Sequence, residues 1–200
     1  MHAVLEGTKE VPTLLLASKS PRRRQLLEQL GYPLRIVDVE VEERLKDQVP
    51  ISMVAAQLAQ QKSRGYLLPL QPGEVLVTAD TVVVSSQEVL GKPHDEADAC
   101  RMLRQLSGCA HQVYTGVCLR TSEHSVLFSE KTTVHFRPLS DEVIRTYISQ
   151  GSCFDKAGAY GIQEWIGMVG VERIEGCYYN VMGLPLSRLY FELQRLIRKS

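Results

Sequence analysis

The sequence predicts an α/β fold in which helices flank a mixed, partly antiparallel β-sheet. Short apolar runs that are typical of buried strands occur among amphipathic stretches with helical periodicity. The two kinds of segment do not alternate strictly, as they would in a parallel sheet built from β–α–β units. A chain of 200 residues can bury a sizeable core, and it contains no internal repeat, low-complexity tract or evident linker. We therefore expect one compact unit, either undivided or two-lobed.

The N-terminal half begins with an expected strand and a capped helix. TLLLA at 13–17 is a continuous apolar run, as in a buried strand. The helix that follows has Ser20 as its N-cap, Pro21 in its first turn and Gly31 as its stop. The other elements expected in this half are a strand over 34–43, a helix over 52–65 that Ser52 begins, a strand over 74–86 and a hairpin return over 88–93.

The C-terminal half continues the mixture of strands and helices. Its expected elements are a helix over 95–108, strands over 111–120 and 125–139, a helix over 140–151, a Gly/Ala-rich loop over 154–163, a hairpin over 168–184 and a final helix from Pro185.

Composition and charge exclude several classes of protein. Lys plus Arg and Asp plus Glu number 23 each, so no overall positive field would recruit nucleic acid or a membrane surface. The apolar runs are too short to span a bilayer, and the N-terminus does not resemble a secretory signal. Five scattered cysteines without a C-x-x-C spacing favour a reducing, cytoplasmic compartment over a disulfide framework or a zinc site.

Three consecutive arginines stand at the start of the first helix, where the helix dipole disfavours positive charge. On a helical wheel, Arg23 falls within the stripe of Leu26 and Leu27, Arg22 lies on its flank, and Arg24 points to solvent. A bound phosphate at this helix N-terminus would remove the conflict for Arg22 and Arg23. The alternative is that these arginines are exposed charges paired with nearby acids.

Lys62 also extends from an apolar helix stripe, because it continues the row of Val54 and Leu58 at a spacing of four residues. It either faces a site or extends its ammonium group to solvent from the edge of the stripe.

Carboxylates and a further lysine complete the candidate site. Asp80 stands at the end of an otherwise apolar strand, and it is either a paired structural charge or a site residue. Glu42 and Glu43 end the strand expected over 34–43. Successive strand residues point to opposite sides, so one of the two can face a cleft. Lys92 follows the hairpin in GKP. Two carboxylates with several basic residues suit Mg²⁺-assisted chemistry on a polyphosphate.

At this point the chain resembles the Maf family of nucleoside triphosphate pyrophosphatases. The resemblance rests on LASKSPRRRQLLEQLG, ADTVVV, GKP, MLRQLSGCAHQVYTGV, DKAGAYGIQ and VMGLPL, which occur in the family's order within residues 13–195. It implies an inosine-triphosphate pyrophosphatase-like fold, with an elongated mixed sheet flanked by helices and a cleft between two lobes. We expect residues 1–12 to be an N-terminal extension and residues 13–200 to be a single domain of this family.

The resemblance also implies an activity and a site. The expected reaction is hydrolysis of a nucleoside triphosphate to the monophosphate and pyrophosphate with a divalent cation, Mg²⁺ or Mn²⁺, in a cytoplasmic homodimer. Asp80 matches the proton acceptor, Glu43 and Lys92 complete the expected catalytic set, and we expect Glu43 and Asp80 to hold the metal. The residues expected to bind substrate are Ser18, Arg22, Arg23, Lys62, Thr81 and Gln163.

Three of these positions indicate the substrate. Arg22, Thr81 and Gln163 are similar to the branch of the family that acts on dTTP and UTP, whereas the branch that acts on 7-methyl-GTP has other residues there. One departure is Glu164, where relatives often have Gly. The alternative functions are a nucleotide-binding regulator of septum formation without turnover and, less favoured by the neutral net charge, nucleic-acid binding through the arginine cluster.

Overall fold

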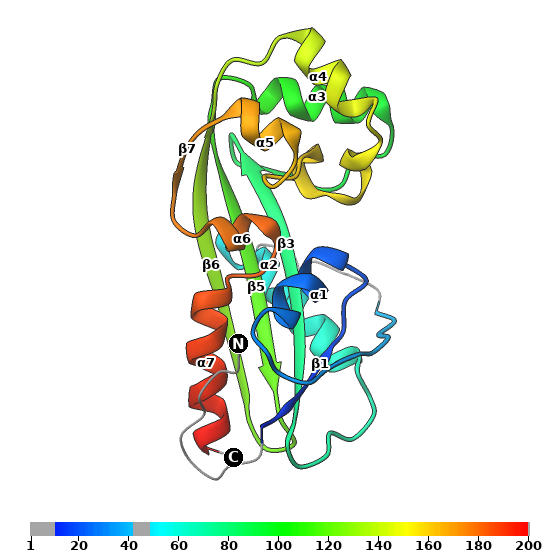
Figure 1. Ribbon diagram of the computed structural model, residues 1–200, viewed down its shortest axis with the longest axis vertical. Helices are drawn as coiled ribbons and strands as arrows, with labels where there is room; N and C mark the ends of the chain where they lie inside the picture. The colour runs from blue at the N-terminus through cyan, green and yellow to red at the C-terminus, as the bar shows by residue number, and fades with distance from the viewer. Residues whose placement is uncertain (1–10, 42–48, 200) are drawn as a thin grey trace. The chain divides into compact units, whose positions relative to one another are not determined.

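The computed structural model of the protein describes residues 11–41 and 49–199. Within these residues the chain forms a mixed seven-stranded sheet of order β2-β1-β3-β5-β6-β7, with β4 paired to β3 beside this path. Helices flank the strands (Figure 1). The predicted α/β class with a mixed sheet is confirmed.

The strands are β1 (Thr13–Leu16), β2 (Leu34–Ile36), β3 (Glu74–Ser85), β4 (Glu88–Leu90), β5 (Ala110–Arg120), β6 (Ser125–Phe136) and β7 (Val171–Glu175). The α-helices are α1 (Pro21–Glu28), α2 (Ile51–Gly65), α3 (Glu96–Leu106), α4 (Asp141–Ile148), α5 (Trp165–Gly170), α6 (Tyr178–Met182) and α7 (Leu186–Lys199). There are also two short 3₁₀ helices, η1 (Ser152–Asp155) and η2 (Ala157–Ala159). The predicted Gly/Ala-rich loop over 154–163 contains η2 and the end of η1.

The chain divides into two compact units. The first unit contains the described part of Met1–Asp80 together with Gly116–Ser129 and Gly183–Ser200. The second unit contains Thr81–Thr115 and Glu130–Met182. Strands β3, β5 and β6 each contribute residues to both units, because the chain passes between the units within these strands.

In the first unit, β1 pairs in parallel with β2 on one side and β3 on the other, with Leu14 opposite both Leu34 and Val75. This buried position explains the continuous apolar run of β1. The expected strand over 34–43 is shorter than the sequence pattern predicts. It ends at Ile36, which lies opposite Leu16, the last residue of β1. Beyond Leu16 the chain leaves the sheet toward α1, so β2 has no further residues of β1 to pair with.

The N-termini of two helices in the first unit test the predicted caps. Ser20 caps α1 as expected, since its hydroxyl accepts a hydrogen bond from the backbone N–H of Arg23. The predicted start of α2 at Ser52 is wrong, because the helix begins at Ile51 with Pro50 in the cap position. The proline ring holds φ at −55°, close to the helical value, so it can lead the chain into a helix without a side-chain cap.

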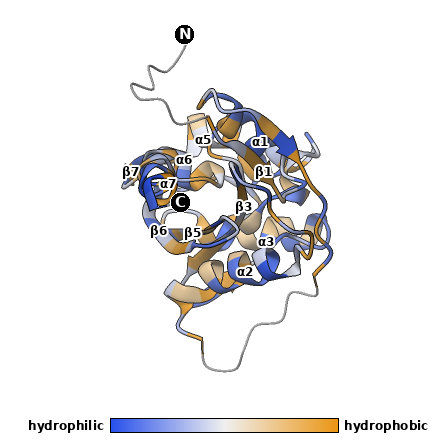
Figure 2. Ribbon diagram, turned by 90° about the horizontal axis from the view of Figure 1, so that it is seen from below, coloured by the Kyte–Doolittle hydropathy of each residue, from blue (hydrophilic) through white to orange (hydrophobic). Residues whose placement is uncertain are grey.

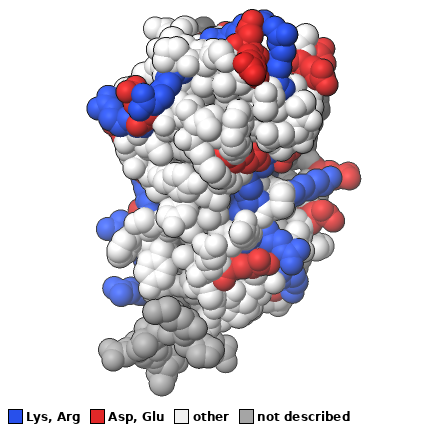
Figure 3. Space-filling view, turned by 45° about the horizontal axis from the view of Figure 1, so that its top comes forward, with Lys and Arg blue, Asp and Glu red and all other residues white. Residues whose placement is uncertain are grey.

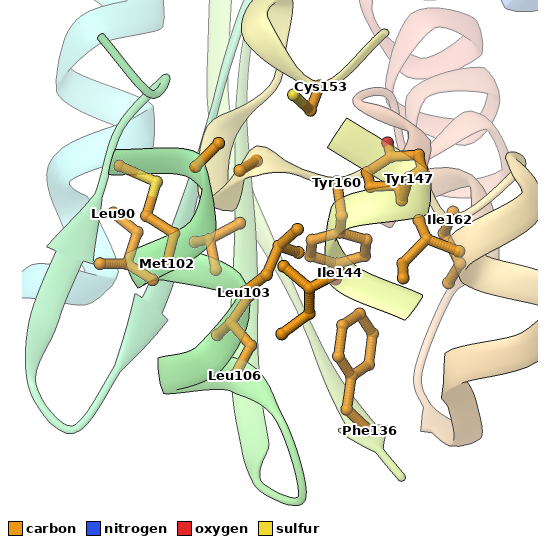
Figure 4. Close-up of a cluster of buried hydrophobic side chains, with 14 of the residues drawn as sticks. Leu90, Met102, Leu103, Leu106, Phe136, Ile144, Tyr147, Cys153, Tyr160 and Ile162 are labelled. Carbon is orange, nitrogen blue, oxygen red and sulfur yellow. The ribbon is translucent and has the colours of Figure 1, made fainter. Parts of the chain in front are cut away.

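The second unit has its own hydrophobic core, which Figure 4 shows around Leu103, Ile144 and Tyr147. Helices α3 and α4 contribute these buried side chains. Strand β4 returns antiparallel to β3 as predicted, and β7 pairs antiparallel with β6.

The predicted hairpin over 168–184 is wrong. Residues 168–170 belong to α5, and the second expected arm is helix α6. The strand in this segment, β7, pairs with β6 instead, with Ile174 opposite Val134. A local sequence pattern can indicate a strand but not the distant strand with which it pairs.

Hydropathy is distributed as expected for helices that cover a sheet. Helices α2 and α3 carry both polar and apolar residues in Figure 2, and the buried residues of α7 are Leu186, Leu189, Leu193 and Leu196. Within the described residues, every helix is too short or too polar to cross a membrane.

Candidate active site

Arg23 turns inward from the first turn of α1. Its Nε donates a hydrogen bond to the carbonyl of Gly183 at 2.9 Å, and its Nη1 donates to the carbonyl of Ala79 at 2.9 Å. Nη1 also lies 3.4 Å from the Ser18 hydroxyl. These acceptors hold the guanidinium next to β3 and confirm that Arg23 does not point to solvent. Ser18 and Arg23, both predicted to bind substrate, are therefore brought together.

The other two arginines differ from Arg23 in their surroundings. Arg24 is exposed, and its Nε lies 2.8 Å from the Oε1 of Glu28 one turn later. The prediction that Arg24 is a surface residue is confirmed. Arg22 is partly buried. Figure 3 shows positive and negative side chains interspersed on the face in view.

Lys62 and Asp80 form an ion pair. The Lys62 Nζ lies 2.5 Å from the Asp80 Oδ1, and the two side chains are only 18% and 16% exposed. Helix α2 supplies the lysine and β3 the carboxylate. Because the pair is largely shielded from solvent, its electrostatic interaction is stronger than that of a surface pair. Lys62 therefore does not extend to bulk solvent, and Asp80 has a cationic partner.

The position of Asp80 in its strand is unusual. Asp80 and Thr81 are partly exposed, whereas the residues on either side, Ala79 and Val82, are buried. The apolar strand thus opens at two adjacent polar side chains, both of which are predicted site residues.

Thr81 belongs to a hydrogen-bonded chain in the second unit. Its Oγ1 lies 2.9 Å from the Oγ1 of buried Thr115, which donates a 2.9 Å hydrogen bond to the carbonyl of Asn180. Because that carbonyl can only accept, the Thr115 proton points to it, and Thr81 is the donor to Thr115. The amide of Asn180 donates to the Val113 carbonyl and to the Thr132 hydroxyl, so α6 is fixed to the sheet at this point.

Gln163 and Lys92 also lie in the second unit. Gln163 stands just before α5, and its Oε1 is buried with no hydrogen-bond partner among the residues described. A buried acceptor without a donor costs free energy. Lys92 follows β4 and is exposed.

The predicted metal ligands are described only in part. Glu43 lies outside the described residues, and Asp80 is described. Among the residues that the structure covers, three or more His, Cys, Asp or Glu side chains do not gather into a group that could hold a metal ion. A carboxylate such as Asp80 nevertheless fits a hard cation, because Mg²⁺ is commonly bound by one or two carboxylates together with substrate phosphates.

Several polar residues at these positions were missed by sequence reasoning. They are Thr115 and Asn180 beside Thr81, and Tyr147, Ser152 and Lys156 near Gln163. Their partners are distant in the sequence or in separate elements, so local periodicity carries no signal for them. The burial of Lys156, with 6% of the residue exposed, is visible only in the fold.

Comparison with known proteins gives matches over most of the chain. A family model described as Maf-like protein matches residues 13–196. The chain is 45% identical to the dTTP/UTP pyrophosphatase of Bacteroides thetaiotaomicron over 95% of this chain and 99% of that protein. It is 47% identical to the dTTP/UTP pyrophosphatases of Phocaeicola vulgatus, over 92% of this chain and 95% of the relative, and of Syntrophomonas wolfei, over 90% and 95%.

Proposed function

Since the chain belongs to the Maf-like protein family, we propose that it is a nucleoside triphosphate pyrophosphatase that acts on dTTP and UTP. The similarity to proteins of that name over nearly the whole chain carries this proposal. The Lys62–Asp80 pair supports it, because it places the expected proton acceptor beside a basic residue that is expected to bind the substrate.

The proposed reaction is attack of water on the α-phosphorus. The new bond joins the water oxygen to that phosphorus, and the bond from it to the oxygen bridging the α- and β-phosphates breaks. Asp80 accepts the proton of the water, and pyrophosphate leaves with the electron pair of the broken bond. The products are the nucleoside monophosphate and pyrophosphate.

The basic residues provide counter-charge for the substrate. A triphosphate carries about four negative charges, and a hydrogen bond between charged groups contributes about 1.5–3 kcal/mol. We assign this role to Arg23, Lys62 and Lys92, with Ser18 as a hydroxyl donor. Arg23 is already oriented by carbonyl groups, so it loses little side-chain freedom on binding.

A divalent cation, Mg²⁺ or Mn²⁺, belongs to the proposal as well. Asp80 would hold it together with Glu43, which lies outside the described residues. When bound, the cation neutralises charge on the phosphates and on the departing pyrophosphate.

Base recognition is assigned to Gln163, with Thr81 and Arg22 contributing to substrate choice. The unpartnered Oε1 of Gln163 can accept a hydrogen bond from the N3–H of thymine or uracil, while its amide can donate to a carbonyl of the base. Cytosine has an acceptor at N3, so Gln163 would need to present its other end to it. This difference predicts a preference for thymine and uracil nucleotides.

A panel of canonical triphosphates tests the proposal. With Mg²⁺ or Mn²⁺, we expect dTTP and UTP to be hydrolysed fastest, with monophosphate and pyrophosphate in equal amounts. Tight binding of these nucleotides without turnover would favour the regulator of septum formation instead. The homodimer, the cytoplasmic location and the absence of a nucleic-acid or membrane partner stay predictions.

A further inference from the structure

Glu164, which directly follows Gln163, is the centre of a polar network in the second unit. Its Oε1 lies 2.8 Å from the Nζ of Lys156. Its Oε2 accepts hydrogen bonds from the Ser152 hydroxyl at 3.0 Å and from the Tyr147 hydroxyl. Three donors therefore hold this carboxylate, and the lysine side chain among them is only 7% exposed.

The same network closes the turn that carries Gln163. The backbone N–H of Glu164 donates to the carbonyl of Gly161 at 3.0 Å, and the N–H of Gly161 donates to the Tyr147 hydroxyl at 3.1 Å. Tyr147 thus contacts both ends of the turn, the first through the backbone of Gly161 and the last through the carboxylate of Glu164. Gln163 lies between these two anchored ends.

Close packing restricts the turn further. A Cβ at Gly161 would lie 2.8 Å from both the Glu164 Cδ and the Lys156 Cε, so the network packs directly against the glycine. On the other side, a Cβ at Gly167 would lie 1.9 Å from the carbonyl oxygen of Ile162. Helix α5 therefore packs against the backbone that leads into Gln163.

Neither helix capping nor stability accounts well for this carboxylate. Glu164 occupies the N-cap position of α5, yet its side chain makes no capping hydrogen bond. A largely buried ion pair is also weak grounds for stability, because apolar residues of similar size often serve as well. A buried ion pair is better explained where it selects one conformation of the chain. Glu164 directly precedes α5 and follows Gln163, the residue proposed to recognise the base.

We propose that Glu164 is a positioning residue for nucleotide selection: with Lys156 and Tyr147 it fixes the turn that holds the Gln163 amide in the orientation that reads the base. This inference rests on the proposed function, since it assumes that Gln163 recognises thymine or uracil. Burial and the adjacent carboxylate raise the pKa of Tyr147, so its hydroxyl keeps the proton that it donates to Glu164.

Two substitutions at Glu164 test the role at different strengths. Glu164→Gln keeps one oxygen that can accept a hydrogen bond but removes the negative charge that pairs with Lys156. Glu164→Ala removes the ion pair and the hydrogen bonds to Tyr147 and Ser152 together. The measurement is the ratio of kcat/KM for dTTP to that for dCTP. We expect this ratio to fall about tenfold in Glu164→Ala and by a smaller factor in Glu164→Gln, which partly rescues it.

A double-mutant cycle shows whether Glu164 acts through Gln163. In the Gln163→Ala background, Glu164→Ala should produce no further loss of the dTTP to dCTP ratio, because the group that it orients is already absent. The matched control is Ile144→Val, which trims the buried core of the same unit. It should lower the melting temperature without changing the ratio.

Hydrogen exchange provides a readout without substrate. Loss of the anchor should speed exchange at the backbone amides of Gly161 and Glu164 in both Glu164 variants. Two results would overturn the positioning role even if exchange speeds up, provided that the wild-type enzyme prefers dTTP to dCTP. One is a Glu164→Ala variant with the same dTTP to dCTP ratio as the wild type, and the other is an equal loss of the ratio when Glu164→Ala is added to Gln163→Ala. Either result would leave the proposed activity intact. A wild-type enzyme without turnover, or without preference between dTTP and dCTP, would overturn the proposed function and the positioning role together.

Discussion

The Lys62 ammonium lies 2.5 Å from the Asp80 carboxylate, with both side chains largely shielded from water. One partner comes from the last turns of α2 and the other from the middle of β3. The pair therefore places a positive and a negative group together where the apolar surface of β3 is interrupted. If Asp80 is the proton acceptor, the two residues have separable contributions to turnover.

Asp80→Asn removes the proton acceptor while keeping the size of the side chain. We expect kcat to fall by about 10²–10⁴-fold, the usual contribution of a general base. The melting temperature should fall as well, because the substitution removes the anionic partner of the shielded Lys62. Steady-state kinetics with dTTP check the fall in kcat. The control is Asp141→Asn, because Asp141 is also ion-paired but exposed, with Arg104 as its partner, and it should leave turnover unchanged. Near-normal turnover of Asp80→Asn would remove Asp80 from the catalytic assignment.

Arg23 and Arg24 are neighbours with opposite expected importance. Arg23→Gln should raise KM by roughly 10–100-fold, which corresponds to the loss of about 1.5–3 kcal/mol of charge-assisted hydrogen bonding. Arg24→Gln should change KM by less than about twofold, because Arg24 is exposed and forms a surface ion pair with Glu28 one turn away. Equal effects of the two substitutions on KM would contradict the inward role of Arg23.

Gly116 is expected to be essential for packing in the first unit. A Cβ there would lie 2.2 Å from the backbone nitrogen of Ala56, so helix α2 packs directly on β5 at this glycine. Gly116→Ala should lower the free energy of unfolding by about 3 kcal/mol or more. Gly91→Ala, which meets no atom within 4 Å, should change it by less than about 0.5 kcal/mol. Urea unfolding of both variants measures the difference.

His111 predicts a pH dependence of stability. Burial lowers its pKa to about 4, below the ordinary value near 6.5, so the folded protein keeps this imidazole neutral. Between these two values the unfolded chain binds a proton that the folded chain does not, and stability therefore falls as the pH falls through this window. From pH 7.5 to pH 5, the loss due to His111 should be roughly 2 kcal/mol.

The variant His111→Gln isolates this effect from other titrating groups. Its free energy of unfolding should fall less than that of the wild type over the same pH range, whereas His124→Gln, a change at an exposed residue, should follow the wild type. Parallel pH profiles for His111→Gln and the wild type would show that the His111 pKa is not lowered in the folded state.

The sequence predicted the elements whose cause is local. The Ser20 cap, the buried run of β1 and the inward direction of Arg23 all follow from propensities and periodicity, and the structure confirms them. The hairpin over 168–184 failed, because β7 pairs with the distant strand β6. The pairing of β1, rather than alternation in the sequence, likewise sets where β2 ends.

The same distinction applies to the candidate site. Arg23, Lys62 and Asp80 stand out in the sequence because each places a charge where an apolar residue is expected. Thr115, an ordinary residue of a β-strand, is recognisable only through its contacts with Thr81 and the carbonyl of Asn180. Long-range hydrogen bonds of this kind leave no periodic signal.

The position of bond cleavage tests the central claim most directly. When dTTP is hydrolysed in water labelled with ¹⁸O, mass spectrometry of the products identifies the phosphorus that was attacked. Attack on the α-phosphorus predicts one ¹⁸O atom in dTMP and none in pyrophosphate, with the two products in equal amounts. Release of orthophosphate, or ¹⁸O in pyrophosphate instead of dTMP, would contradict the proposed reaction.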